Sequence, residues 1–292
     1  MTRKKFTLQV ALGLVAVMVA LCLTLLPGAP PLRPLPNPNG YDDFVKAANV
    51  SQATYSDKWM QPELAAYVTF GAEALRLARV GMTKDCRVDL QSFAGSFPQG
   101  YIELDAWKGV EMLFLAEGRL ALLEGRTNDA VNAYLDGIHF AQEFSRGGLL
   151  VSRITSIDCE AMISKQLTPL AGGLSATNCR TIATALETLD TKEEPIQETL
   201  HQEAAWTRKQ YGIRGQIEKL FTYKQDKSSR DKLIAEDQSR ARQRRQLMIA
   251  AAARAYQSDT GKRPQRAADL VPKYLGAVPK DPATGKDLSL GP

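Results

Sequence analysis

The chain has 292 residues, of which 44% are apolar and 24% are charged, so it is long enough to bury one or two hydrophobic cores. Its formal net charge of +5 is mild, and composition alone gives no reason to expect a nucleic-acid partner. The cations are unevenly distributed, because the stretch from Trp206 to Arg266 holds sixteen Lys and Arg residues against six Asp and Glu.

An uncharged apolar stretch, Phe6–Leu26, follows three basic residues at positions 3–5. As a helix it would span about 31 Å, close to the thickness of a hydrocarbon core. The basic flank predicts a cytoplasmic N-terminus, with everything from Pro27 onward outside. The alternative is a cleaved signal peptide, although Ala29 is followed by proline and so offers a poor cleavage site. The bulky residue before Cys22 argues against a lipid attachment site.

A proline-rich linker, 27–40, carries six prolines and predicts an extended spacer that holds the body off the membrane. The next segment, 41–190, predicts a helical bundle, because apolar residues recur at helical spacing. Residues 82–100 are rich in Gly, Ser and Asp and predict a loop. The predicted helices are 62–80, 102–124, 128–144, 149–167 and 175–189.

The segment 191–258 is long, basic and helical in pattern, with a soft break expected around 223–230. A cap at 259–292 follows, in which glycines and prolines at turn positions predict an irregular coil with one helical turn at 267–270. Because no stretch before residue 270 alternates with period two, the body is predicted to be all-α.

Small residues and one aromatic in the middle of the chain resemble a single tetratricopeptide repeat. In such a repeat, small residues let two antiparallel helices approach closely, and a glycine makes the turn between them. The resemblance implies a tetratricopeptide-like helical hairpin, and ordinary helix-bundle packing is the alternative. The residues that carry it are Phe114, Gly118, Gly125, Ala130, Tyr134 and Gly137.

No catalytic, cofactor-binding or metal-binding residue can be assigned from the sequence. The two histidines, His139 and His201, lie in predicted helices and lack a partner at ligand spacing. The adjacent acids Asp42–Asp43 and Glu193–Glu194 do not share a helix face and are interpreted as acids at helix starts. An enzyme is therefore the weaker hypothesis, and no cofactor is expected.

Three cysteines, Cys86, Cys159 and Cys179, would lie in an oxidising compartment if this topology holds. One disulfide, between Cys86 and Cys159, is one interpretation. Small buried thiols on helices are the other.

The basic zone, 206–266, contains aromatic residues among its charges. Outside the membrane, nucleic acid is not expected as its partner. Contact with anionic lipid or an acidic polymer is one hypothesis, and a solvated helix face is the simpler one.

The last 45 or so residues resemble the extracytoplasmic half of the major pseudopilin of type II secretion. Tyr256, Gly261 and Pro264 match that family's helix end and turn, and Leu270–Leu275 and Pro279–Pro282 match the stretch that follows. The N-terminal sequence KKFTL also resembles a pilin-type leader, but Lys5 replaces its glycine and Val10 its glutamate. We assign no calcium site.

The order of parts resembles a family of bacterial membrane-anchored proteins, which implies a single-pass inner-membrane protein with its bulk in the periplasm. We expect a non-enzymatic envelope protein whose helical domain is a protein-interaction scaffold. The first alternative is a component of a type II secretion or pilus-like assembly. The second is an envelope hydrolase with an unrecognised site.

Overall fold

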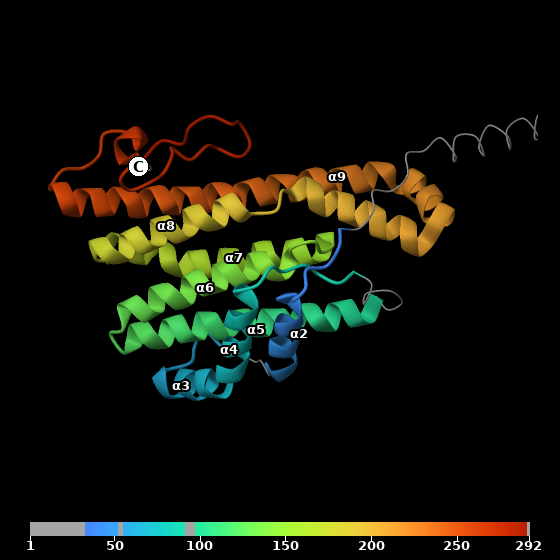
Figure 1. Ribbon diagram of the computed structural model, residues 1–292, viewed down its shortest axis with the longest axis horizontal. Coiled ribbons are helices and arrows are strands. Elements are labelled where there is room, and N and C mark those ends of the chain that lie inside the picture. The colour runs from blue at the N-terminus through green and yellow to red at the C-terminus, as the bar shows by residue number, and fades with distance from the viewer. Residues whose placement is uncertain (1–32, 52–54, 91–96, 291–292) are drawn as a thin grey trace, which may run out of the picture.

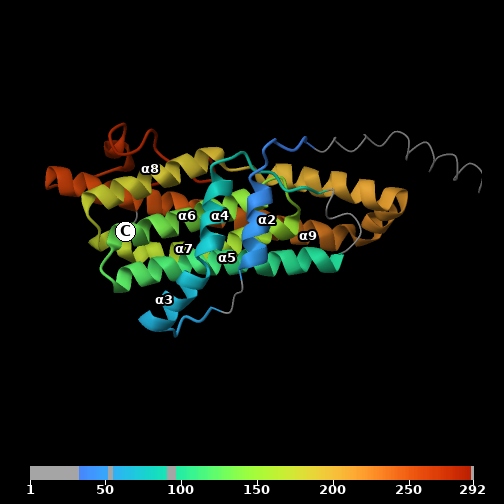
Figure 2. The same ribbon diagram turned by 60° about the horizontal axis from the view of Figure 1, so that its bottom comes forward.

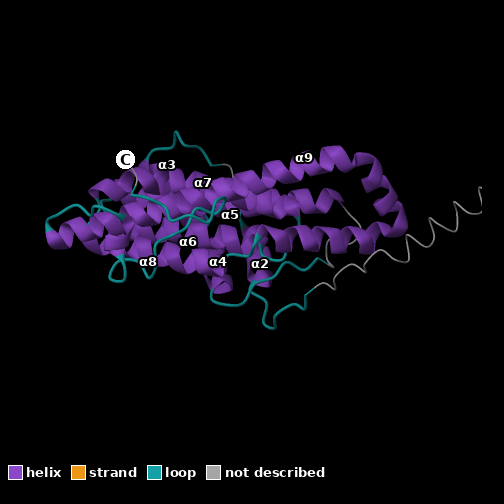
Figure 3. Ribbon diagram, turned by 90° about the horizontal axis from the view of Figure 1, so that it is seen from above, coloured by secondary structure: helices purple, strands orange, loops and turns teal. Residues whose placement is uncertain are grey.

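The computed structural model describes residues 33–51, 55–90 and 97–290, and its regular elements in these ranges are helical, as Figures 1 and 3 show. The predicted all-α class is confirmed for this part of the chain. The helices are α2 (Tyr41–Val50), α3 (Gln61–Phe70), α4 (Ala72–Met82), α5 (Phe97–Leu123), α6 (Thr127–Ser145), α7 (Leu150–Leu170), α8 (Ala176–Lys192) and α9 (Ile196–Thr260), with the 3₁₀ turns η1 (Ala171–Gly173) and η2 (Ala267–Leu270).

The long helices α5 to α9 run along the longest axis of the molecule (Figure 1). α6 packs on α5, α7 and α8, and α9 packs on α7 and α8. The shorter α2 and α4 pack on each other and cross α5 and α6 on one face (Figure 2). The cap lies on the opposite side, against α9 (Figure 1). The bundle is thus enclosed by short helices on one side and by α9 with its cap on the other.

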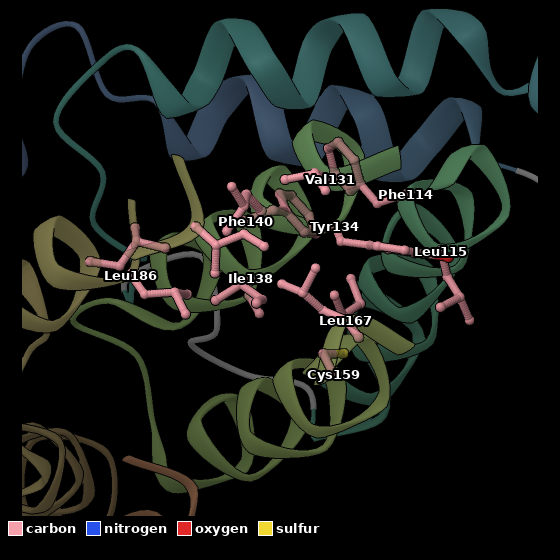
Figure 4. Packing of buried hydrophobic residues seen from close by; sticks show 14 of the residues in the cluster. Phe114, Leu115, Val131, Tyr134, Ile138, Phe140, Cys159, Leu167 and Leu186 are labelled. Atoms are coloured by element: carbon pink, nitrogen blue, oxygen red, sulfur yellow. The ribbon is translucent and has the colours of Figure 1, made fainter. Parts of the chain in front are cut away.

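Aromatic side chains fill the centre of this bundle. Phe44 and Phe140 meet edge to face with ring centroids 5.1 Å apart, and Trp107 stacks on Phe144 at 5.3 Å. Figure 4 shows the part of the core between α5, α6 and α7. One hydrophobic cluster extends from Tyr41 to Leu288, so the predicted bundle, basic segment and cap contribute to the same core.

The predicted hairpin is formed by α5 and α6, and glycines determine how closely its helices approach. A Cβ atom on Gly118 would lie 2.3 Å from the Tyr134 ring. One on Gly137 would lie 3.2 Å from the Phe114 Cβ and 2.1 Å from Ile163 of the adjoining α7. Gly125 makes the turn with a φ of 72°, a left-handed conformation that glycine adopts without strain. These glycines allow the close approach of α5 and α6 and the turn between them.

Two predicted helix boundaries are wrong. The helix expected over 62–80 is interrupted at Gly71, where a Cβ atom would lie 2.1 Å from the Leu113 side chain. The break expected at 223–230 is absent, because α9 continues through it and is instead broken at Gly212, with φ 53° and ψ −140°. Polar composition does not by itself end a helix, whereas a glycine with positive φ interrupts it.

Beyond this break α9 folds back, so that it has two arms, and the second arm returns along α8 (Figure 1). Between the arms the chain reverses at one end of the molecule. The turns after α5 and α7 lie at the other end (Figure 1).

The end of the predicted spacer is attached to the body. Arg33 donates to Glu198 at 2.6 Å, and the Asn39 side chain donates to the Arg87 carbonyl at 2.8 Å and accepts from its N–H at 3.0 Å. Residues 33–40 are therefore not a free spacer, because these hydrogen bonds hold them against α9 and the loop after α4.

The cap begins where Gly261, at φ 68°, ends α9. The helical turn predicted at 267–270 is present as η2, and an isolated antiparallel bridge joins Lys280 to Asp287. Tyr274 donates to Asp259 at 2.9 Å and meets Tyr256 edge to face, which fastens the cap to the end of α9.

Cys86, Cys159 and Cys179 are buried free thiols. Cys159 on α7 and Cys179 on α8 match the second interpretation, whereas Cys86 lies in the loop after α4. The predicted membrane span, Phe6–Leu26, lies outside the described residues. Within the described ranges, the helices are too short or too polar to cross a bilayer.

Replacing Gly118 with alanine is expected to destabilise the protein by about 1–3 kcal/mol, because the added methyl group would overlap the buried Tyr134 ring. Urea unfolding monitored by circular dichroism measures this change. Gly172→Ala is the control, since nothing lies within 4 Å of a Cβ atom there, and its effect should stay within about 0.5 kcal/mol. Equal effects of the two substitutions would contradict the close-approach argument.

Candidate functional site

A cluster of buried ionic side chains joins α7, α8 and α9, and we call it the charge cluster. Its arginines lie on α7 and on the second arm of α9. Its acids come from all three helices and from the link between α8 and α9. The members are Arg153, Glu160, Asp190, Glu193, Asp237, Arg240 and Arg244.

Arg244 is at the centre of the charge cluster, with only 1% of its side chain exposed. Its Nη1 donates to both oxygens of Glu160, at 2.8 and 3.1 Å, and its Nη2 donates to Asp190 at 3.0 Å and to Glu193. One guanidinium thus links α7, α8 and the segment after α8. The planar fork of arginine suits this multiple bonding, which a lysine could not reproduce.

Arg240 and Arg153 complete the charge cluster on either side of Glu193. Arg240 donates to Glu160, to Glu193 and, at 2.9 Å, to Asp237. Arg153 donates to Asp237 at 2.9 Å and to Glu193 at 2.7 Å. Glu193 therefore accepts hydrogen bonds from all three buried guanidinium groups.

Helical spacing explains why these side chains converge. Arg240 and Arg244 are one turn apart on α9, and Arg153 and Glu160 are two turns apart on α7, so each pair shares one helix face. At the rim, Arg245 donates to both oxygens of Asp190 and, at 2.6 Å, to the Lys280 carbonyl. The charge cluster is thereby connected to the cap.

The charge cluster changes the acidity of its members. Burial alone would raise the pKa of Glu193, but Arg244, Arg240 and Arg153 outweigh it and lower the pKa to about 2. Burial would lower the pKa of Arg244, yet Glu160 and Glu193 raise it. Glu193, Arg240 and Arg244 therefore carry their charges at neutral pH.

Two sequence interpretations of these residues are wrong. Glu193 and Glu194 are not acids in the first turn of a helix, because they lie between α8 and α9. There Glu193 binds the buried arginines, and Glu194 accepts from the Gly147 N–H at 2.7 Å. Arg240 and Arg244 do not lie on a solvated basic face. No local signal in the sequence separates these buried arginines from exposed ones, because their acceptors lie on other helices. The interpretation of Asp42–Asp43 is confirmed, since both lie in the first turn of α2.

A separate buried carboxyl, Glu111 on α5, lies close to the charge cluster but is not part of it. It is fully buried, and neither oxygen has a hydrogen-bond partner among the described residues. Its Oε1 lies 3.3 Å from where a Cβ atom on Gly137 would be. Burial, reinforced by the charge of Glu160, raises the pKa of Glu111 well above its usual value. We infer that Glu111 is protonated over a range of pH in which exposed carboxyls are ionised.

The histidines are not brought together. His139 is half-buried on α6, 4.0 Å from Glu143, and burial lowers its pKa. His201 is exposed on the first arm of α9. In the part of the chain that the structure describes, no three His, Cys, Asp or Glu side chains are grouped so as to hold a metal ion.

An open polar groove of about 520 Å³ lies at the end of the bundle, between the turn after α5 and the turn after α7. The first turns of α6 and α8 border it, and their hydroxyl, amide and carboxylate groups line it. Its most buried polar member is Asn178, whose backbone N–H donates to the Ser175 hydroxyl at 3.2 Å. The lining residues are Gly125, Arg126, Thr127, Asn128, Asp129, Gly173, Leu174, Ser175 and Asn178.

Comparison of the chain with protein-family models, with curated proteins and with solved structures finds no match. The functional interpretation therefore depends on the arrangement of these residues alone.

Replacing Arg244 with methionine should destabilise the protein by about 3–5 kcal/mol, because Glu160 and Glu193 would lose a buried counter-charge. Arg242→Met on the same helix is the matched control. Arg242 is exposed and pairs with Asp281 at 3.2 Å, so its loss should cost less than about 1 kcal/mol. Urea unfolding at neutral pH measures both. Similar small losses would mean that the charge cluster contributes little to stability.

Replacing Glu111 with glutamine should change how stability depends on pH. Because the pKa of Glu111 is raised in the folded state, its contribution to stability is present below the unfolded pKa and is lost as pH rises toward the folded pKa. The free energy of unfolding of Glu111→Gln, relative to the unsubstituted protein, should therefore increase between about pH 5 and about pH 8. A difference that is constant over this range would contradict a protonated Glu111.

Proposed function

We propose that this protein is a non-enzymatic, single-pass membrane-anchored envelope protein whose helical body is a scaffold for binding another protein. The anchor is the apolar stretch Phe6–Leu26, and its basic flank supports a cytoplasmic N-terminus with the body in the periplasm of a bacterium. The attachment of residues 33–40 to the body supports a short connection between anchor and scaffold.

The observation that carries this proposal is the contrast between the interior and the groove. The buried arginines of the charge cluster are paired with acids from neighbouring helices, which makes them structural links. The groove, in contrast, presents hydrogen-bonding groups to solvent at one end of the bundle. Polar groups of this kind suit a polar loop of a partner protein.

The α5–α6 hairpin supports a tetratricopeptide-like scaffold. Its helices approach closely at Gly118 and Gly137, and its turn at Gly125 forms one edge of the groove. A partner bound there would contact the ends of a rigid hairpin, which lowers the entropy that binding costs.

A component of a type II secretion or pilus-like assembly is the alternative. The turn at Gly261, the helical turn at 267–270 and the Lys280–Asp287 bridge lie in the stretch that resembles the pseudopilin, and they favour it. Leader processing between Lys5 and Phe6 would support this alternative, and intact-mass measurement of the membrane-extracted protein detects it. An envelope hydrolase is the second alternative. Glu111 gives it no support, because that carboxyl is fully enclosed.

A photo-crosslinking amino acid at Asn128, in the groove, should capture one discrete protein in intact membranes. The same photo-crosslinking amino acid at Lys46, an exposed position on α2, is the control and should capture no protein. Gel-shifted bands identified by mass spectrometry provide the measurement. If Asn128 and Lys46 give the same bands, or if Asn128 gives none, the groove is not the partner surface of a scaffold.

A further inference from the structure

The positive charge of the protein is concentrated where α9 folds back. Residues 207–232, which we call the α9 hairpin, contain eight Lys and Arg against three Asp and Glu. This surplus of five equals the net charge of the whole chain. Further along α9, Arg240 and Arg244 contribute little to the surface, because they are buried in the charge cluster.

The described side chains of the α9 hairpin are turned to solvent. Lys209, Lys227 and Lys232 are exposed, and Arg230 is partly exposed. Lys232 has 78% of its side chain exposed and a distant contact, 3.7 Å, to Glu236. Such cations are hydrated and available to a mobile anionic surface.

The N-terminal connection brings this hairpin close to the proposed anchor. Arg33 is bound to Glu198, near the start of the first arm of α9. The six residues 27–32 separate Arg33 from the apolar stretch, so the bilayer surface lies within about 20 Å of Arg33. From Glu198 the first arm extends about 21 Å to Gly212, where the hairpin turns. The first arm and the connection are therefore of similar length. The turns after α5 and α7, whose residues line the groove, lie at the opposite end of the molecule (Figure 1).

We propose that the α9 hairpin binds the headgroups of anionic lipids on the side of the bilayer where the anchor emerges. This inference rests on the proposed single-span anchor. Clustered Lys and Arg residues beside a membrane span are attracted to anionic headgroups, and the attraction acts over a Debye length of about 8 Å at physiological ionic strength. The short connection limits how far the hairpin can lie from the bilayer surface, which favours lipid over a polymer that must diffuse to it. Binding would orient the body so that the groove faces away from the membrane.

Energy transfer in lipid nanodiscs tests the proposal on the full chain. A donor dye is attached at Ser229→Cys, an exposed position of the α9 hairpin, and an acceptor dye is carried by lipid headgroups. Ser258→Cys, exposed at the far end of α9, is the control position. Cys22 is replaced by serine in both proteins, and the other native cysteines are buried.

Transfer from Ser229→Cys should rise about twofold when phosphatidylglycerol is added to phosphatidylcholine discs, and salt should reverse the rise. Transfer from Ser258→Cys should not change. The triple substitution Lys227→Glu, Arg230→Glu and Lys232→Glu should abolish the rise. The same reversal of three charges at the far end, in Lys262, Arg263 and Arg266, should leave it intact. Circular dichroism establishes that both triple variants are folded.

The outcomes separate this inference from the proposed function. If the chain enters the discs but transfer from Ser229→Cys is the same in both lipid mixtures, the hairpin inference is overturned and the anchored scaffold stands. Equal effects of the two triple variants would also overturn it. If the chain does not enter the discs at all, the anchor fails, and the inference fails with it.

Discussion

The attachment of α9 to the bundle depends on one buried ionic interaction, in which Nη1 of Arg244 donates to both carboxylate oxygens of Glu160. Moving these charges out of water is costly, and only the surrounding acids and arginines compensate for it. Arg240 and Arg244 are one turn apart on α9, and their acceptors are fixed on α7, on α8 and after α8. All these ion pairs can therefore form together in only one position of α9 along the bundle. We infer that the charge cluster sets the position of α9 along the bundle, and with it the positions of the cap and of the α9 hairpin.

This arrangement gives the two ends of the molecule different properties. One end holds the polar groove between two helix turns, and the other holds the α9 hairpin with the surplus of positive charge. The charge cluster lies between these ends, and its acids pair with Arg240 and Arg244 in the middle of α9. The basic residues of α9 are therefore of two kinds, those buried in the charge cluster and those exposed on the α9 hairpin.

Sequence patterns predicted the helices of the bundle well, because the periodicity of apolar residues and the turn glycines act locally. Gly125 and Gly261 were identified as turn positions, and both adopt positive φ. The break at Gly71 could not be predicted from local pattern, since it depends on Leu113, which is 42 residues away in sequence. The charge cluster was missed for the same reason, because an arginine on a polar helix has the same local signature whether it faces water or a distant glutamate.

The sequence by itself determined the helical class, the α5–α6 hairpin, the order of segments and the concentration of cations after Trp206. These properties follow from composition and from spacing over a few residues. Only the tertiary structure decided which of those cations are buried, where α9 reverses, and that Glu111 is enclosed without a partner among the described residues. The physical reason is that burial and ionic pairing join residues far apart in the sequence, such as Glu160 and Arg244, which are 84 positions apart. Their energy depends on the geometry of several helices together.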